Sequence, residues 1–75
     1  MDKIRKLENE IKEQNAIKAD YKKEVDDAEK ALKKKEITQQ HFDKVKKKYE
    51  DHAEKCNEKI VAARKGIEEL RKADQ

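Results

Sequence analysis

The sequence predicts an all-α protein in which two long helices form an antiparallel coiled-coil hairpin, and two observations lead to that prediction. First, 52% of the 75 residues are charged and 33% are hydrophobic, with no proline and one glycine. The chain therefore lacks the turn residues and strand-forming segments that a sheet protein needs. Second, apolar residues recur at alternating steps of three and four, the spacing of a helix that buries one narrow stripe. Too few large apolar side chains are present for a large globular core.

The first helix is predicted over about residues 2–34. Steps of three and four from Ile4 to Leu32 meet nine positions, of which seven are apolar, and the residues between them are mainly Lys, Glu, Asp and Asn. The two polar positions are Gln14 and Lys18. A polar residue in such a stripe can fix the register of pairing at a cost in stability, or a lysine there can extend its charged end to water. The second interpretation is favoured for Lys18.

A turn is predicted at about residues 35–38. If the helix continued unbroken, Lys35 and Gln39 would leave a polar gap in the stripe, and Ile37 would point into water. Thr38 is a good N-cap residue for a new helix. No glycine or proline marks the segment, so the end of the first helix carries a weaker signal than the start of the second.

The second helix is predicted over about residues 39–73. Phe42 stands where a hydrophobic staple with Ile37 would place it, although the capping box is incomplete because the third helical residue is His41. Eight of the nine stripe positions from Phe42 to Leu70 are apolar. Acidic residues that precede a lysine by four positions, such as Glu29 and Glu68, add local support to both helices.

The turn region also resembles a known pattern. Ile37, Thr38, Phe42 and Lys46 match the order Gly-x-Ile-Thr-x-x-x-Phe-x-x-x-Lys found between the two helices of SHOCT-type short helical domains. Lys35 stands where that pattern favours glycine. The resemblance covers about a dozen of the 75 residues. It implies a helix–turn–helix break and oligomerisation, and it carries over no catalytic residue.

Folding the chain at the turn makes residue i face residue 74 − i, so that large side chains tend to meet small or medium ones. The rival arrangement is a single long helix in an antiparallel dimer, which makes the same pairs between two chains. The predicted helix-packing seam consists of Ile4, Leu7, Ile11, Tyr21, Val25, Leu32, Phe42, Tyr49, Cys56, Ile60, Ile67 and Leu70.

A two-helix hairpin of this size buries little apolar surface against the entropy of ordering the chain. We therefore expect a homo-oligomer, such as a four-helix bundle, or docking on another helical protein. Four apolar residues lie off the stripe and either form a second contact surface or are ordinary scattered surface residues. They are Ile17, Ala31, Val45 and Val61.

The chain offers few residues suited to catalysis, because it has no serine and no glycine-rich loop. His52 and Cys56 lie four apart on one helical face, the spacing of a Cys–His pair or of half a zinc site. The favoured interpretation is structural, with Cys56 filling the seam and His52 at its flank. The sequence predicts no enzyme, no catalytic or metal-binding residue, no cofactor and no small-molecule substrate. One cysteine and the absence of an apolar run or secretory signal predict a cytoplasmic protein without a membrane span.

The positive charge is concentrated in the middle of the chain. Residues 1–28 and 49–75 each carry a net charge of −1, whereas residues 29–48 carry eight lysines and three acids, a net charge of +5. A hairpin gathers these lysines around one tip, which either only keeps the surface hydrated or attracts a nucleic-acid backbone or an acidic protein patch. The function predicted first is a non-enzymatic interaction and oligomerisation module, and the alternative is a nucleic-acid-binding protein of low specificity. The residues of that possible contact are Lys30, Lys33, Lys34, Lys35, Lys44, Lys47 and Lys48.

Overall fold

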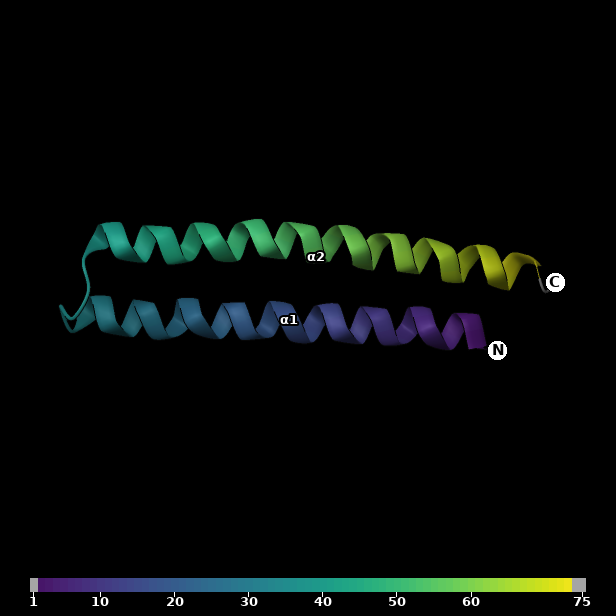
Figure 1. The fold of residues 1–75 in the computed structure, drawn as a ribbon, viewed down its shortest axis with the longest axis horizontal. Helices are drawn as coiled ribbons and strands as arrows, with labels where there is room; N and C mark the ends of the chain where they lie inside the picture. The colour runs from purple at the N-terminus through teal and green to yellow at the C-terminus, as the bar shows by residue number, and fades with distance from the viewer. Residues whose placement is uncertain (1, 74–75) are drawn as a thin grey trace.

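The computed structural model describes residues 2–73 and consists of two helices, α1 (Asp2–Lys33) and α2 (Gln39–Ala73). The helices run antiparallel, so Asp2 and Ala73 lie at one end of the molecule and the turn lies at the other (Figure 1). The two predicted properties, an all-α fold and a chain folded back on itself as a hairpin, are confirmed. The molecule measures 58 × 15 × 12 Å.

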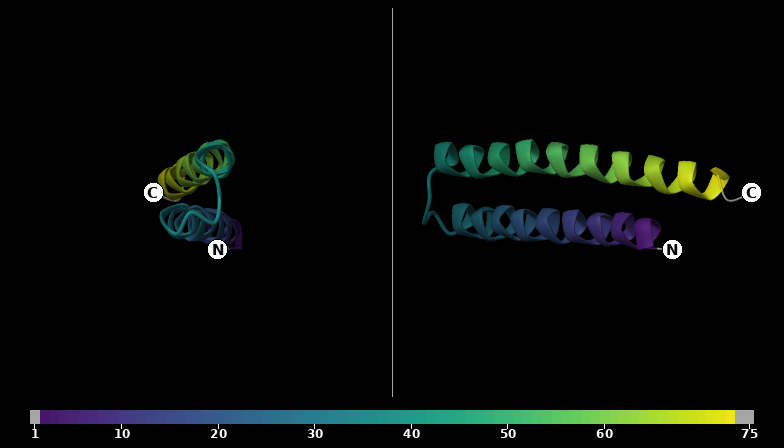
Figure 2. Two further views of the ribbon diagram at one scale, coloured as in Figure 1. Left: turned by 90° about the vertical axis from the view of Figure 1, so that its left-hand side faces the viewer. Right: turned by 45° about the vertical axis from the view of Figure 1, so that its right-hand side comes forward.

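The core is a single stripe between the two helices, which stay side by side along their length in every view (Figure 2). No side chain in the described part of the chain falls below 2% exposure. Since each helix has only one neighbour, the remaining faces of both helices are open to solvent. The buried hydrophobic residues are Val25, Cys56, Ile60, Ala63 and Ile67.

The end of α1 is a Schellman motif, one residue before the predicted helix end. The backbone N–H of Lys35 donates to the carbonyl of Leu32 at 3.0 Å, and the N–H of Glu36 donates to the carbonyl of Ala31 at 2.9 Å. These two bonds satisfy carbonyls that a helix end otherwise leaves without partners. Lys35 has a φ of 62°, the left-handed conformation that this motif requires.

The start of α2 is capped by Thr38, as the sequence predicts. The backbone N–H of His41 donates to Thr38 Oγ1 at 3.1 Å, and the N–H of Phe42 donates to the Thr38 carbonyl at 3.0 Å. Ile37 and Phe42, the two positions of the expected hydrophobic staple, are both half-buried. The turn is therefore defined by a left-handed residue on one side and a threonine cap on the other.

Gly66 lies within α2, where glycine is unfavourable by about 1 kcal/mol relative to alanine. A Cβ atom at this position would lie 3.0 Å from Leu7 Cδ1, which is closer than ordinary van der Waals contact. The missing side chain therefore leaves room for Leu7 of α1. This contact agrees to within one residue with the predicted pairing of residue i with 74 − i.

Neither helix, over the residues that the structure describes, contains a stretch apolar enough to cross a bilayer.

Candidate interaction surfaces

The predicted packing seam lies between the helices, with no member exposed. Four of its twelve residues, Val25, Cys56, Ile60 and Ile67, are buried. Ala63 is also buried, at 3% exposure, and belongs to the same stripe. The half-buried members are Ile4, Leu7, Ile11, Tyr21, Leu32, Phe42, Tyr49 and Leu70. Burial is therefore deepest on α2, opposite the middle and the N-terminal half of α1.

The two polar positions of the first stripe behave differently from each other. Gln14 is 6% exposed, and its side-chain amide donates to Glu10 Oε1 at 3.1 Å. Lys18 extends to the edge of the seam, where its Nζ donates to Asn57 Oδ1 on α2 at 2.6 Å. Gln14 is thus a polar group held inside the stripe, whereas Lys18 carries its charge out to a partner on the other helix.

Aromatic rings link the helices near the middle of the hairpin. The rings of Tyr21 and His52 stack with centroids 4.2 Å apart and planes 9° apart. Lys48 Nζ lies 5.8 Å from the Tyr21 ring centroid, and Lys22 Nζ lies 5.8 Å from that of Tyr49. These distances are within the range of a cation–π contact, worth about 0.5–1 kcal/mol at exposed sites. The cluster joins α1 to α2 by specific geometry in a region with few large apolar residues.

His52 and Cys56, the pair considered for thiol or metal chemistry, take different positions. Cys56 is 5% exposed and lies in the stripe as a free thiol. The ring of His52 is committed to its stack with Tyr21. Within residues 2–73, no three His, Cys, Asp or Glu side chains gather as metal ligands would. Both residues thus contribute to packing between the helices.

A shallow groove runs along one side of α2. Its apolar floor is made by Tyr49, Ala53, Val61 and Ala62, and its polar lining includes Glu50, Glu54, Asn57 and Glu58. Val61 is 63% exposed, more than Ile17, which is the other exposed large hydrophobic residue within residues 2–73. Since all eight residues belong to α2, the groove is an open helix face, suited in shape to another helix.

The other off-stripe apolar residues do not join Val61. Ile17 is 40% exposed and lines a separate hollow with Tyr21 and Lys48. Ala31 and Val45 are half-buried. The four residues that the sequence groups as one possible second surface are therefore divided among different places. Spacing relative to the heptad could have separated Val61 from the others, because it lies on the opposite side of the stripe.

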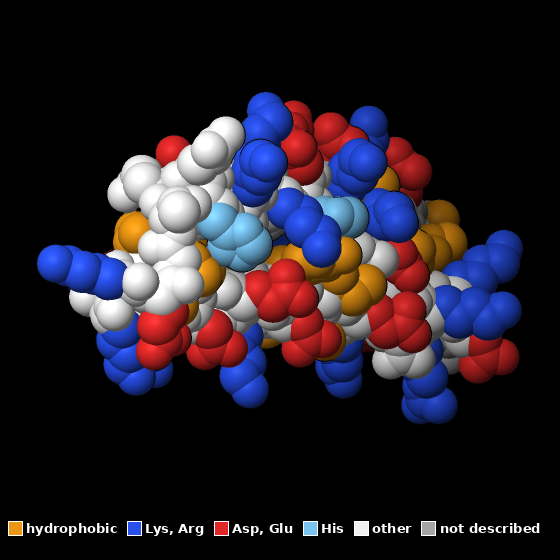
Figure 3. All heavy atoms as spheres, turned by 60° about the vertical axis from the view of Figure 1, so that its left-hand side comes forward, with side chains coloured by type: hydrophobic (Ala, Val, Ile, Leu, Met, Phe, Trp, Pro, Cys, Tyr) orange, Lys and Arg blue, Asp and Glu red, His pale blue; other side chains and the backbone are white. Residues whose placement is uncertain are grey.

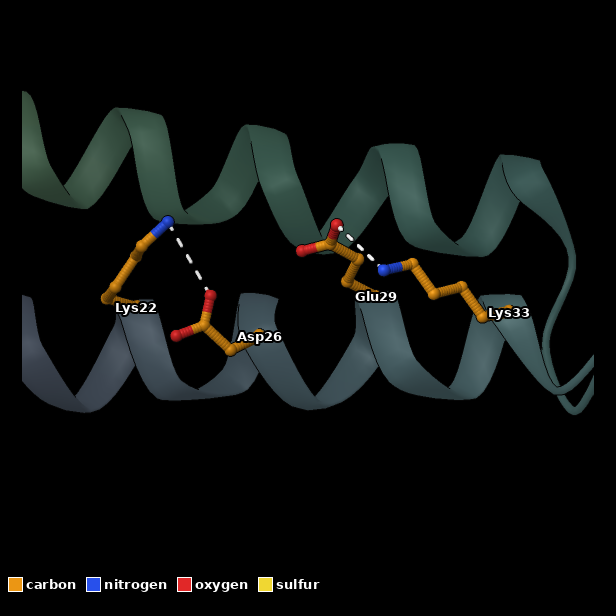
Figure 4. Close-up of polar contacts among 4 residues, drawn as sticks. All are labelled: Lys22, Asp26, Glu29 and Lys33. Carbon is orange, nitrogen blue, oxygen red and sulfur yellow. Dashed lines mark ion pairs between the residues drawn. The ribbon is translucent and has the colours of Figure 1, made fainter.

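Seven lysines predicted as a possible anion contact are exposed at the turn end of the molecule, where basic side chains project with acidic ones between them (Figure 3). Within residues 2–73, Lys33 is the member of this set with an ion-pair partner, Glu29 at 3.8 Å. Figure 4 shows this pair beside the Lys22–Asp26 pair at 3.6 Å, both within α1. Such exposed pairs contribute only a few tenths of a kcal/mol, about 0.3–0.5.

Four lysines surround one shallow hollow on α2. Lys44, Lys47, Lys48 and Lys55 line it together with Asp51 and His52. The first three belong to the predicted basic tip, and Lys55 extends the positive surface by two turns along the helix. A hollow of this composition attracts anions by charge, without the planar, bidentate geometry that arginine provides.

No protein-family model matches the chain, and the searches of curated proteins and of solved structures likewise give no match.

Proposed function

We propose that this protein is a non-enzymatic interaction module that assembles with itself or with another helical protein through helix–helix packing. The observation that carries the proposal is its large exposed surface. The accessible area is 6177 Å². A compact monomer of the same mass would expose about 4,800 Å² by the usual scaling of area with mass. The hairpin thus leaves uncovered more surface than a self-sufficient domain of its size.

The thin core supports the same proposal. Within residues 2–73, five hydrophobic residues are buried and each helix contacts a single neighbour. Chains of this size usually add a disulfide, a metal or a partner to a small core. A partner helix lying against the open side of α2 would extend that core. We include a cytoplasmic location in the proposal, because the single buried thiol of Cys56 suits a reducing compartment.

Sedimentation equilibrium over about a hundredfold concentration range tests self-assembly by mass action. We expect the mean mass to rise with concentration above that of one chain, 8.9 kDa. The control is the same experiment at high salt, which weakens surface charge attraction but leaves apolar packing in place. A mass that stays at one chain throughout would contradict self-assembly.

A second candidate function, low-specificity binding of a nucleic-acid backbone, is supported by the hollow that Lys44, Lys47, Lys48 and Lys55 line. Lysines attract phosphates as point charges without reading base sequence. Residues 29–48, which include the turn, carry a net charge of +5.

Binding of a short duplex DNA at several salt concentrations tests this candidate. The slope of log affinity against log salt should become shallower by about 0.9 for each phosphate that the protein no longer neutralises. Changing Lys44 and Lys48 to Gln should therefore flatten the slope. The matched control changes Lys3 and Lys12 to Gln, which removes equal charge from the first half of α1. Equal effects of the two double variants would indicate attraction to net charge alone.

A further inference from the structure

The outward face of α2 carries charges in an ordered sequence on both sides of its apolar groove. Two lysines, Lys46 and Lys47, come first, followed by Glu50 and Asp51. Beyond the groove residue Val61 the order repeats, with Arg64 and Lys65 and then Glu68 and Glu69, and all eight charged residues are exposed. The spacing of four within each half keeps them on one helical face.

Helical geometry divides these charges into two rows. At 3.6 residues per turn, one row contains Lys46, Glu50, Arg64 and Glu68. The other row contains Lys47, Asp51, Glu58, Lys65 and Glu69, and Val61 lies between the rows. From the turn toward the C-terminal end of α2, each row begins with a basic and then an acidic residue and ends with the same order, and Glu58 lies at the centre of the second row.

This order is complementary to itself when reversed. We propose that the α2 face is the contact surface between two copies of this chain, packed antiparallel about a two-fold axis near Asn57 and Glu58. Lys46 then meets Glu68 of the second copy, and Glu50 meets its Arg64. In the other row, Lys47 meets Glu69 and Asp51 meets Lys65. The inference rests on the proposed function and names its partner and register.

Two other alignments place more like charges together than the proposed one, in which Glu58 meets its own copy at the axis. A parallel pair would set each charged residue against its own copy. Sliding the antiparallel partner by one heptad toward the turn of the second copy brings Asp51 against its Glu58 and Lys44 against its Lys65. The proposed register also lays Val61 over Ala53 of the second copy, and the small side chain of that alanine in the groove floor allows close approach.

The exposed area suits a contact of this size. The hairpin exposes about 1,400 Å² more than a compact monomer would. A specific interface buries about 800 Å² on each partner. One α2 face per chain is therefore enough to cover much of the excess, and the symmetric contact closes at two copies.

Charge exchange tests the pairing directly. The first variant carries Glu50→Lys and Asp51→Lys, and the second carries Arg64→Glu and Lys65→Glu. In each variant alone, both contacts become repulsive, and we expect monomers at a concentration where the unchanged chain is dimeric. In an equal mixture of the two variants, the altered rows are again complementary. We therefore expect sedimentation equilibrium to give the mass of a dimer for the mixture. Asp20→Lys with Asp27→Lys on α1 is the matched control and should leave the dimer intact.

Val61→Glu probes the centre of the same face. In the proposed dimer this change buries a carboxylate in place of the valine side chain. It should raise the dimer dissociation constant about 30-fold, the effect of removing a central interface side chain. Glu58→Gln should do the opposite, because the two copies of Glu58 face each other at the axis. Helix content by circular dichroism should be unchanged in all variants, since every altered side chain is exposed on the hairpin.

The outcomes separate the two proposals. If the unchanged chain is monomeric at every concentration, this inference fails together with self-assembly. If the chain assembles but the charge variants and Val61→Glu assemble equally well, the helix-packing function stands and the α2 face is overturned as its surface. If each charge variant is monomeric alone and their equal mixture is monomeric too, the antiparallel register is wrong.

Discussion

At the scale of single residues, Lys35 stands out because its backbone adopts a conformation that glycine adopts without steric cost. Its φ of 62° places the Cβ close to the following carbonyl oxygen. The Schellman bonds from Lys35 and Glu36 back to α1 hold this geometry in place. The turn therefore stores a local steric cost at Lys35.

Replacing Lys35 with Gly should stabilise the hairpin by about 1 kcal/mol, because the left-handed conformation then carries no side-chain penalty. Urea denaturation followed by circular dichroism measures the change. Lys30→Gly is the control within α1, where a helical glycine should lower stability by about 1 kcal/mol. A loss of stability in both variants would mean that Lys35 is not strained in solution.

The sequence predicts this turn mainly from signals for the start of the second helix, and only weakly from the end of the first. Thr38 and the apolar residues around it signal a helix start, and the cap is present as an Oγ1 bond to His41. The end of α1 carries no comparable signal, since lysine at a left-handed position is indistinguishable from any surface lysine before the backbone is known. That is why the predicted end of the first helix and the end of α1 at Lys33 differ by one residue.

At the scale of the elements, α1 is the weaker partner in the seam. Two of its described residues are buried, Gln14 and Val25, whereas α2 contributes four. A buried amide reduces the apolar contact that the stripe can make. Its hydrogen bond to Glu10 lies within α1 and is independent of the alignment of the helices, but a polar side chain in the stripe disfavours alignments that bury it against apolar side chains alone. The first helix thus gives up stability at its centre in exchange for a defined alignment.

Gln14→Leu should raise the free energy of unfolding by about 1–2 kcal/mol, the gain from burying a leucine side chain in place of an amide. The same change should broaden the mass distribution in sedimentation, because registers that were disfavoured become acceptable. Asn15→Leu, one residue away and exposed, is the control and should change neither quantity. If Gln14→Leu fails to stabilise, the Glu10 hydrogen bond contributes as much as the added apolar burial.

Periodicity predicts both helices and their stripe, because a heptad pattern depends only on the order of residues along the chain. It does not predict the contacts between the helices in detail. The stack of Tyr21 on His52 and the bond from Lys18 to Asn57 depend on side-chain conformations as well as on register. Sequence reasoning placed His52 at the flank of the seam, but nothing in the spacing distinguishes a stacked ring from a solvated one.

At the scale of the whole molecule, the structure is a rod with one buried stripe and a large solvated surface. Its longest dimension is 58 Å against 15 and 12 Å in the other two directions. The residues that the hairpin brings together meet across a single interface. Stability should therefore depend on anything that covers a further face of the rod.

The thermal midpoint should rise by a few degrees for each tenfold increase in protein concentration, about what mass action gives when a folded dimer unfolds to separate chains. Circular dichroism melts at several concentrations measure this dependence. The Val61→Glu variant serves as the control, and its midpoint should depend less on concentration over the same range, because its dimer is weaker. An invariant midpoint in the unchanged chain would indicate that the hairpin unfolds as a monomer.

The position of both helix ends beside each other, opposite the turn, has a mechanical consequence (Figure 1). A force applied between Asp2 and Ala73 pulls the helices apart from that end, so seam contacts break one after another, starting with Ile4 and Leu70. A force applied between the turn and the same end would run along the helix axes instead, so it would stretch the helices without pulling them apart. The hairpin should therefore open at low force in the first geometry and resist strongly in the second.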